Sequence, residues 1–367
     1  MDGVFITGLD APGAGPALAV KDLFDTAGVR TTYGSAIYAD HVPDTTAPAV
    51  ARLEAAGYRN VGKANLHEFA WGITSENEHY GWVPNPVAPG RIAGGSSGGN
   101  AAALAASLAD AALGTDSGGS IRIPAACCGV VGFKPTHGLV SLEGCFPLAP
   151  SYDHAGPMAR DVATCERMME ALVDGFETAA PVELGELTVA LGWTEQADPL
   201  VRARVEEAAA GFGVVRRVEL PFPDGTYPVF AREAAEVHAE LWRDHRDAYG
   251  ANVAFKVERA MQVEDAAVRA AERARASYRE RMAELMAGVD LLVTPTLSVV
   301  APPAGVGDLA LREQLLRLTY PFNVIGAPAL ALPCGPAEHC LPASVQLVGR
   351  LGEDAFVLAA GRALETI

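Results

Sequence analysis

Short apolar runs alternate with amphipathic stretches along most of the chain, and this alternation is typical of α/β proteins. Runs bounded by Gly, Pro or Asp predict strands at 60–64, 111–116, 187–192, 214–220, 290–294, 329–332 and 344–348, and a further short apolar run lies at 16–20. Longer periodic stretches predict helices at 44–56 (with Asp44 as the N-cap), 100–108, 198–210 and 354–364. Together they predict a central twisted sheet, mixed or largely parallel, with helices on both faces.

Residues 229–288 depart from this alternation, because they are charged, rich in Ala and predict two long helices. We expect this region to cover one end of the sheet and to shape a substrate pocket, although a solvated helical hairpin fits the sequence equally well. Roughly 150 residues per domain would suggest two domains for a chain of 367 residues. No repeat or linker divides the chain, so we expect a single domain over 1–367.

Composition excludes several classes of protein. Half of the residues are hydrophobic and 20% are charged, which excludes a disordered chain. The formal net charge of −17 repels phosphate backbones and anionic membranes, so we expect no direct nucleic acid and no membrane contact. The beginning of the sequence lacks the features of a signal peptide, and no run of about 18 apolar residues occurs, so we expect a soluble, cytoplasmic protein.

The six cysteines and the histidines show no metal-binding spacing. We interpret the cysteines as mostly buried thiols in a reducing compartment, and we expect neither a metal nor a cofactor.

Two clusters of Gly and Ser are the strongest chemical signal, at 94–99 (GGSSGG) and 114–124 (GTDSGGSIRIP). Glycines beside a serine let a substrate approach the backbone amides, which suits a serine nucleophile next to an oxyanion hole. Residues 94–98 also match G-x-S-x-G, but a proline-broken loop precedes them where a nucleophile elbow requires a strand. Walker and G-x-G-x-x-G phosphate motifs are absent, so flexible glycine loops are the main alternative.

On these clusters and on motifs along nearly the whole chain, the sequence is identified as a member of the amidase signature family of serine hydrolases. The matching segments are 19–22 (AVKD), 62–69 (GKANLHEF), 85–86, 94–100, 114–124, 129–135 (GVVGFKP), 290–295, 323–335 (NVIGAPALALPCG) and 341–349. The resemblance implies the amidase-signature fold.

The family uses a Ser–cisSer–Lys triad, and each member has a counterpart in this sequence. The resemblance implies that Ser120 is the nucleophile, Ser96 the bridging serine that follows a cis peptide bond, and Lys21 the base. A lysine accepts a proton only when neutral, and burial lowers its pKa toward that state. Without the serine clusters, Lys21 would be interpreted as an ordinary surface lysine at the end of a strand.

Further residues follow from the same resemblance. The backbone N–H groups implied for the oxyanion hole belong to Ser117, Gly118, Gly119 and Ser120. The residues expected to support them are Ser97, Asp116 and Arg122.

The implied function is a stand-alone amidase that hydrolyses an aliphatic or aryl amide and has a small-molecule amide as its partner; a homodimer is left open. We expect pocket walls from Trp71, 145–152 and 229–288, with Phe146, Leu148 and Tyr152 indicating an apolar acyl group. The N-terminal helices of longer relatives do not precede Lys21, which suggests a more open pocket.

The main alternative is the glutaminase subunit of a tRNA-dependent amidotransferase. That subunit carries an acidic residue several positions before an Asn-Leu-Ala-Gly segment, whereas 315–322 holds no carboxylate and the segment at Asn323 reads NVIG. A carbamate- or urea-type hydrolase would use the same acyl chemistry. A non-catalytic scaffold is disfavoured by the intact triad.

Overall fold

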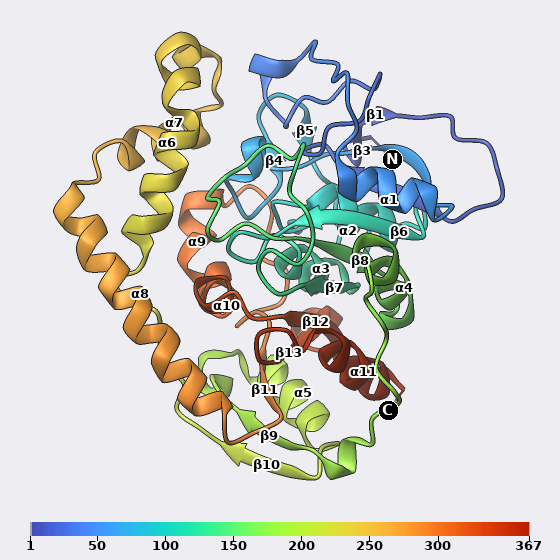
Figure 1. The fold of residues 1–367 in the computed structure, drawn as a ribbon, viewed down its shortest axis with the longest axis vertical. Coiled ribbons are helices and arrows are strands. Elements are labelled where there is room, and N and C mark those ends of the chain that lie inside the picture. Colours follow the sequence, from blue (N-terminus) through green and yellow to red (C-terminus); the bar gives the residue numbers. More distant parts are fainter. Residues whose placement is uncertain (1, 367) are drawn as a thin grey trace.

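An eleven-stranded mixed sheet forms the centre of the protein (Figure 1). This computed structural model describes residues 2–366. From one edge to the other, the strands are β1 (Phe5–Gly8), β3 (Arg59–Ala64), β2 (Ala17–Lys21), β6 (Ala111–Thr115), β8 (Ala155–Ala159), β7 (Val131–Lys134), β12 (Ala329–Pro336), β13 (Pro342–Val348), β11 (Leu291–Pro295), β9 (Thr188–Leu191) and β10 (Val214–Arg217).

Parallel pairing occurs toward both ends of the sheet, where β2 pairs with β3 and β6, and β9 pairs with β10 and β11. The strands between these two groups pair antiparallel. The mixed sheet confirms the fold class expected from the sequence. A separate two-stranded sheet joins β4 (Glu76–Asn77) and β5 (Gly81–Trp82).

Helices cover both faces of the sheet and bury its alternating apolar side chains. One face packs against α1 (Pro48–Ala55), α4 (Val162–Leu172), α5 (Pro199–Ala209) and α11 (Asp354–Glu365). The other face packs against α2 (Gly98–Ala105), α3 (Arg122–Cys128) and α10 (Tyr320–Ile325), and α9 (Asp308–Leu316) lies beside α3. Short 3-10 helices lie at 36–38, 68–70, 184–186, 194–196, 246–248 and 338–340.

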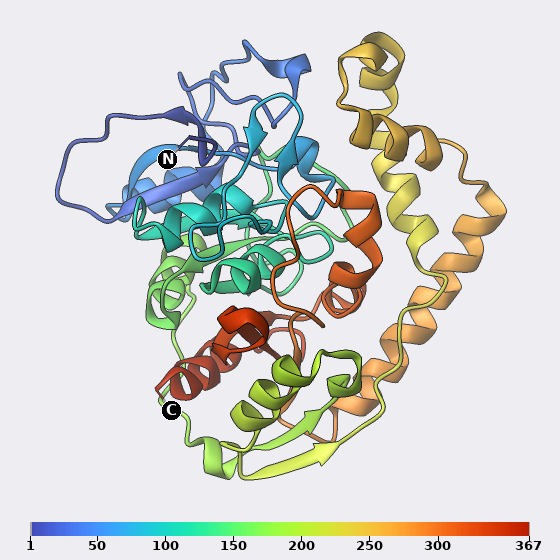
Figure 2. The ribbon, with the colours of Figure 1, turned by 180° about the vertical axis from the view of Figure 1, so that it is seen from behind.

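An arm of three helices runs along one side of the molecule, as Figures 1 and 2 show: α6 (Tyr227–His245), α7 (Ala251–Ala260) and α8 (Asp265–Met286). The prediction of two helices for this region was wrong. The amide of Gly250 donates to the Glu68 carboxylate, and the amides of Ala251 and Asn252 donate to Glu78. These distant carboxylates satisfy the first amides of α7, so a separate helix begins there.

Other differences from the sequence prediction are local. The helix expected to begin after Asp44 begins at Pro48, because proline suits the first helical position and has no amide hydrogen to satisfy. The strand expected over 214–220 ends at Arg217, where its partner β9 also ends at Leu191. Helix α2 ends at Ala105, three residues earlier than expected from the run to residue 108.

All six cysteines are free, and Cys127, Cys128 and Cys165 are buried. Within residues 2–366, no helix combines the length and the apolar character that crossing a membrane requires.

Candidate active site

Lys21 is the last residue of β2, and its side chain is fully buried. Because β2 and β6 are parallel neighbours, their carboxyl ends meet at the same edge of the sheet, which places Lys21 beside Thr115 at the end of β6. Lys21 Nζ donates a hydrogen bond of 2.7 Å to Ser96 Oγ and another of 2.7 Å to Thr115 Oγ1.

Burial lowers the pKa of Lys21 to about 7, and the charges of Asp116 and Asp153 offset part of this effect. Within residues 2–366, Lys21 forms no ion pair with a carboxylate. A lysine in this environment exchanges between its charged and neutral forms near neutral pH, so it can accept a proton from the hydroxyl that it contacts.

The two Gly–Ser loops contact each other beside Lys21. The peptide bond between Gly95 and Ser96 is cis, as the resemblance implied. The amide of Ser97 donates to the carbonyl oxygen of Ser120 at 3.2 Å, and the Ser97 hydroxyl donates to the carbonyl oxygen of Thr115 at 3.2 Å. Ser97 therefore joins the two loops, which lie about twenty residues apart in the sequence.

Ser120 lies between this buried pair and a cavity of about 480 Å³ that it lines together with Ser117 and Gly118. The residue is 6% exposed. The two loops meet through backbone contacts, and no hydrogen bond between the hydroxyls of Ser96 and Ser120 is formed in the described chain.

The amides of residues 117–120 donate no hydrogen bond to any other group of residues 2–366, which leaves four consecutive donors beside the cavity. Such unpartnered amides can stabilise an oxyanion. Gly119 has a φ of +139°, a conformation that favours glycine. The Thr319 hydroxyl donates to the carbonyl oxygen of Gly118 at 2.6 Å and so holds the loop from α10's side.

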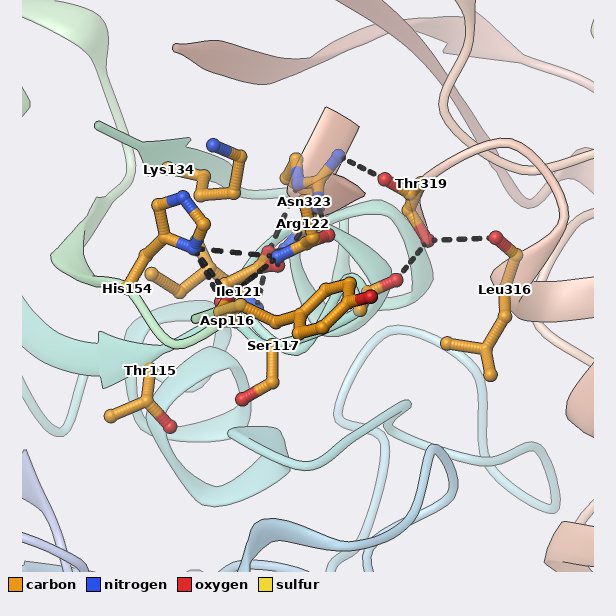
Figure 3. A network of polar contacts seen from close by, with 12 residues as sticks. Thr115, Asp116, Ser117, Ile121, Arg122, Lys134, His154, Leu316, Thr319 and Asn323 are labelled. Carbon is orange, nitrogen blue, oxygen red and sulfur yellow. Dashed lines mark hydrogen bonds and ion pairs between the residues drawn. The ribbon is translucent and has the colours of Figure 1, made fainter. Parts of the chain in front are cut away.

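Beneath this loop lies a buried polar network, shown in Figure 3. The Arg122 guanidinium donates to both carboxylate oxygens of Asp116, at 3.0 and 2.8 Å. Burial opposes the charge of Asp116, but the Arg122 guanidinium outweighs it and holds the pKa of this carboxyl well below its usual range. Arg122 also donates to the Thr319 carbonyl, the Gln346 side chain and the Asn323 side chain.

A second contact holds the loop near the cavity wall. The Ser117 hydroxyl donates to Asp153 Oδ1 at 2.5 Å, and Asp153 accepts hydrogen bonds from the amides of Leu148 and Ala149. The conformation of the Ser117–Ser120 segment is thus coupled to that of the wall that contains Leu148.

The structure brings together the residues singled out in the sequence, but several neighbours were missed. Thr115 could have been found, since it stands inside the second Gly–Ser cluster. Asp153, Thr319 and Gln346 had no local signal, because they reach the site from other strands and loops. Asn323 belongs to a segment that carried the family resemblance, without a role having been assigned.

The cavity wall also differs from expectation. Trp71 and Leu148 line it as predicted, but Phe146 and Tyr152 do not. Phe146 packs against the rings of Tyr33 and Phe69, and Tyr152 stacks on Tyr320. The remaining wall comes mainly from three further segments: 222–230, 309–317 and 320–321.

Residues 2–366 contain no group of three or more His, Cys, Asp or Glu side chains placed to hold a metal ion. The chemistry available at this site is therefore that of a buried lysine, serine hydroxyls and unpartnered amides, which together define a hydrolase of the serine–lysine type.

Comparison with known proteins agrees with this class. The model of the Amidase family matches residues 10–184 and 233–358. The A-type component of the glutamyl-tRNA(Gln) amidotransferase from Thermus thermophilus is 38% identical over 96% of this chain and 85% of its own.

Solved structures give the same result. A crystal structure of an amidase superposes with a TM-score of 0.88 at 38% identity, covering 96% of this chain and 84% of that one. A 6-aminohexanoate cyclic dimer hydrolase superposes with a TM-score of 0.86 at 27% identity, covering 99% of this chain and 89% of that one. The protein belongs to the amidase signature family and is a hydrolase that acts on carbon–nitrogen bonds.

Proposed function

We propose that this protein is a stand-alone amidase that hydrolyses carboxylic amides through an acyl-enzyme on Ser120. The observation that carries the proposal is the hydrogen bond from the buried Lys21, whose pKa is lowered to about 7, to Ser96, next to the cavity that Ser120 lines. We assign Lys21 as the base, Ser96 as the proton relay and Ser120 as the nucleophile.

In the first half of the reaction, neutral Lys21 accepts a proton from Ser96 as Ser96 takes the proton of Ser120. The Ser120 oxygen forms a bond to the amide carbon, and the carbonyl oxygen becomes an oxyanion that the amides of 117–120 stabilise. The carbon–nitrogen bond then breaks, the proton returns through Ser96 to the leaving nitrogen, and ammonia or an amine departs.

In the second half, water attacks the Ser120 ester while Lys21 accepts its proton through Ser96. The ester bond breaks, Ser120 regains a proton, and the carboxylic acid is released. Ser97, Asp116 and Arg122 act by holding the two loops, since their hydrogen bonds end on loop backbone or on one another.

The second candidate is a glutaminase subunit of a tRNA-dependent amidotransferase, and the curated relatives named for that enzyme favour it. The wall of the cavity supports the stand-alone function instead. In the segment before Asn323, where the glutaminase subunit is expected to carry an acidic residue, this chain places Leu316 and Tyr320 on the cavity. An ammonium group of glutamine gains no carboxylate from that segment.

The test is release of ammonia or amine by the purified chain from glutamine, short aliphatic amides, aryl amides, anilides and a carbamate. We expect release from apolar amides without a partner protein. Ser120→Ala should abolish both turnover and the mass shift of the acyl-enzyme, while Ser277→Ala, on an exposed face of α8, serves as the matched control.

Full turnover by Ser120→Ala would refute the nucleophile assignment. Release from glutamine alone, or activity that requires an added partner protein, would favour the amidotransferase function.

A further inference from the structure

Arg312, on α9, lines the same cavity as Ser120 and is half-buried. A guanidinium group has five N–H donors. Within residues 2–366, Arg312 uses one of them, because Nη2 donates to the Tyr227 hydroxyl at 3.1 Å, and it forms no ion pair with a carboxylate. The fully buried Arg122, by contrast, has all of its nitrogens hydrogen-bonded.

The charged groups nearest to Arg312 are already engaged with other partners. Asp308, one helical turn earlier, accepts the amide of Ile73 at 2.6 Å through Oδ1 and the ammonium of Lys256 at 2.5 Å through Oδ2. The adjacent Glu313 has a side chain that is 92% exposed and lies 3.9 Å from Arg317.

Two further charges line the cavity. Asp224 is exposed and forms no ion pair in the described chain, and Arg317 packs over the Phe222 ring at 4.2 Å and donates to Gln196. The charges of these groups are therefore exposed or satisfied away from Arg312. In a protein with a net charge of −17, an arginine without an anionic partner is left in the wall of the substrate cavity.

Most of the remaining lining is apolar or aromatic. The side chains with this character are Trp71, Ile73, Leu148, Phe230, Leu309 and Leu316. The cavity thus combines a nucleophile, an apolar middle and a planar cation whose donors are unused. A guanidinium binds a carboxylate through two parallel hydrogen bonds, which makes this arrangement selective for a planar anion.

Resting on the proposed function, we propose that the natural substrate carries a carboxylate at the far end of its acyl portion. The carboxylate binds Arg312, an apolar spacer fills the middle of the cavity, and the scissile amide lies at Ser120. The acyl side is the side expected to carry this group, because it remains bound through both halves of the reaction whereas the amine leaves after the first.

The experiment compares monoamides of dicarboxylic acids with neutral amides of the same length. The charged panel is succinamate, glutaramate, adipamate and terephthalamate, and the neutral panel is butyramide, valeramide, hexanamide and 4-methylbenzamide. Glutamine differs from glutaramate by one amino group, so that pair separates the two proposed functions. The wild-type protein should favour at least one charged substrate by roughly ten- to a hundredfold in kcat/KM.

The decisive quantity is the ratio of kcat/KM between the charged and the neutral substrate of each pair. Arg312→Met should reduce this ratio to about one, mainly by raising KM for the charged substrate. Arg259→Met removes the same charge from an exposed position on α7 and should leave the ratio unchanged. Binding of the dicarboxylate products to Ser120→Ala, measured by calorimetry, should be lost in the Ser120→Ala/Arg312→Met double variant.

A wild-type ratio near one for every pair, or a ratio that survives in Arg312→Met, would overturn the substrate assignment. If neutral amides are hydrolysed with dependence on Ser120 in that case, the proposed amidase function stands alone. If no amide of either panel forms an acyl-enzyme, both proposals fail.

Discussion

Two buried lysines of this protein have similar environments in one respect and opposite ones in another. Lys21, beside the Gly–Ser loops, and Lys256, on α7, are both almost completely withdrawn from solvent. Burial lowers the pKa of Lys21 to about 7 and that of Lys256 to about 8. Desolvation by itself therefore does not distinguish a catalytic lysine from a structural one.

The partners of the two ammonium groups distinguish them. Lys21 donates to two hydroxyls, which can pass protons, whereas Lys256 donates to the carboxylate of Asp308, to the Trp71 carbonyl and to Asn252. Burial opposes the charge of Asp308, but Lys256 outweighs it and holds the pKa of that carboxyl well below its usual range. We infer that Lys256 anchors α7 to the cavity wall and to α9, while Lys21 acts as a base.

The sharpest break of this comparison is Lys21→Met, which keeps much of the volume of the side chain and removes the amine. We expect kcat to fall by about 10²–10⁴-fold, the range typical of a lost general base. The measurement is steady-state turnover on the best amide, with the midpoint of urea unfolding as the control for folding. Unchanged turnover in a folded variant would show that Lys21 is not the base.

Lys256→Met should instead reduce stability. Removing one partner of a buried ion pair typically costs about 3–5 kcal/mol, because the other charge is left without compensation. Urea unfolding followed by circular dichroism measures the change. The double variant Lys256→Met/Asp308→Leu removes both charges and should recover much of the loss. Equal instability of the single and double variants would argue against the ion pair as the cause.

The dependence of activity on pH separates the two lysines further. Lys21 must be neutral to accept a proton, so kcat/KM should fall about tenfold per pH unit below pH 7 and level off above it. Because the folded pKa lies below that of the unfolded chain, the contribution of Lys21 to stability should rise with pH between about 7 and 10.5.

Thr115→Val tests this assignment, since it removes an acceptor that favours charged Lys21. The acidic limb should then move to lower pH. A limb that does not move, or that moves to higher pH, would indicate that another group controls the rate.

The smallest expected effect concerns the loop of unpartnered amides. Thr319→Val removes the hydroxyl that donates to the Gly118 carbonyl, and we expect about a tenfold fall in kcat, below the 10²–10³-fold cost of losing an oxyanion donor outright. Thr319→Ser should retain most activity. Affinity for a peptidyl or alkyl aldehyde, which forms an oxyanion, should fall more than affinity for the carboxylate product. Equal losses for both ligands would indicate a general structural role.

Local signals in the sequence were sufficient for much of the fold and for the candidate residues at the centre of the site. Buried strands such as Ala111–Thr115 are short apolar runs, and their pattern survives in any tertiary context. The Gly–Ser loops could be recognised because glycine and serine at these positions are needed for the backbone itself. Lys21 drew attention as one of few lysines, and its position at the end of a strand followed from the same apolar run.

Tertiary structure alone decided what surrounds these residues. The amides that begin α7 are satisfied by Glu68 and Glu78, which lie more than 170 residues away in the sequence, so periodicity could not separate that helix from α6. Thr319 reaches the Gly118 carbonyl across a separation of 201 residues. Contacts at such separations leave no periodic trace in the chain.

The cavity illustrates the same limit most clearly. Part of its wall, including Phe222, Tyr227 and Phe230, comes from the stretch 185–232 that the family model does not match. Arg312 enters from α9 with donors that no other described residue occupies. The sequence by itself determined the sheet, the two loops and the class of chemistry, because these depend on local patterning and on backbone requirements. The fold decided the shape and charge of the cavity, because these depend on side chains brought together from distant segments.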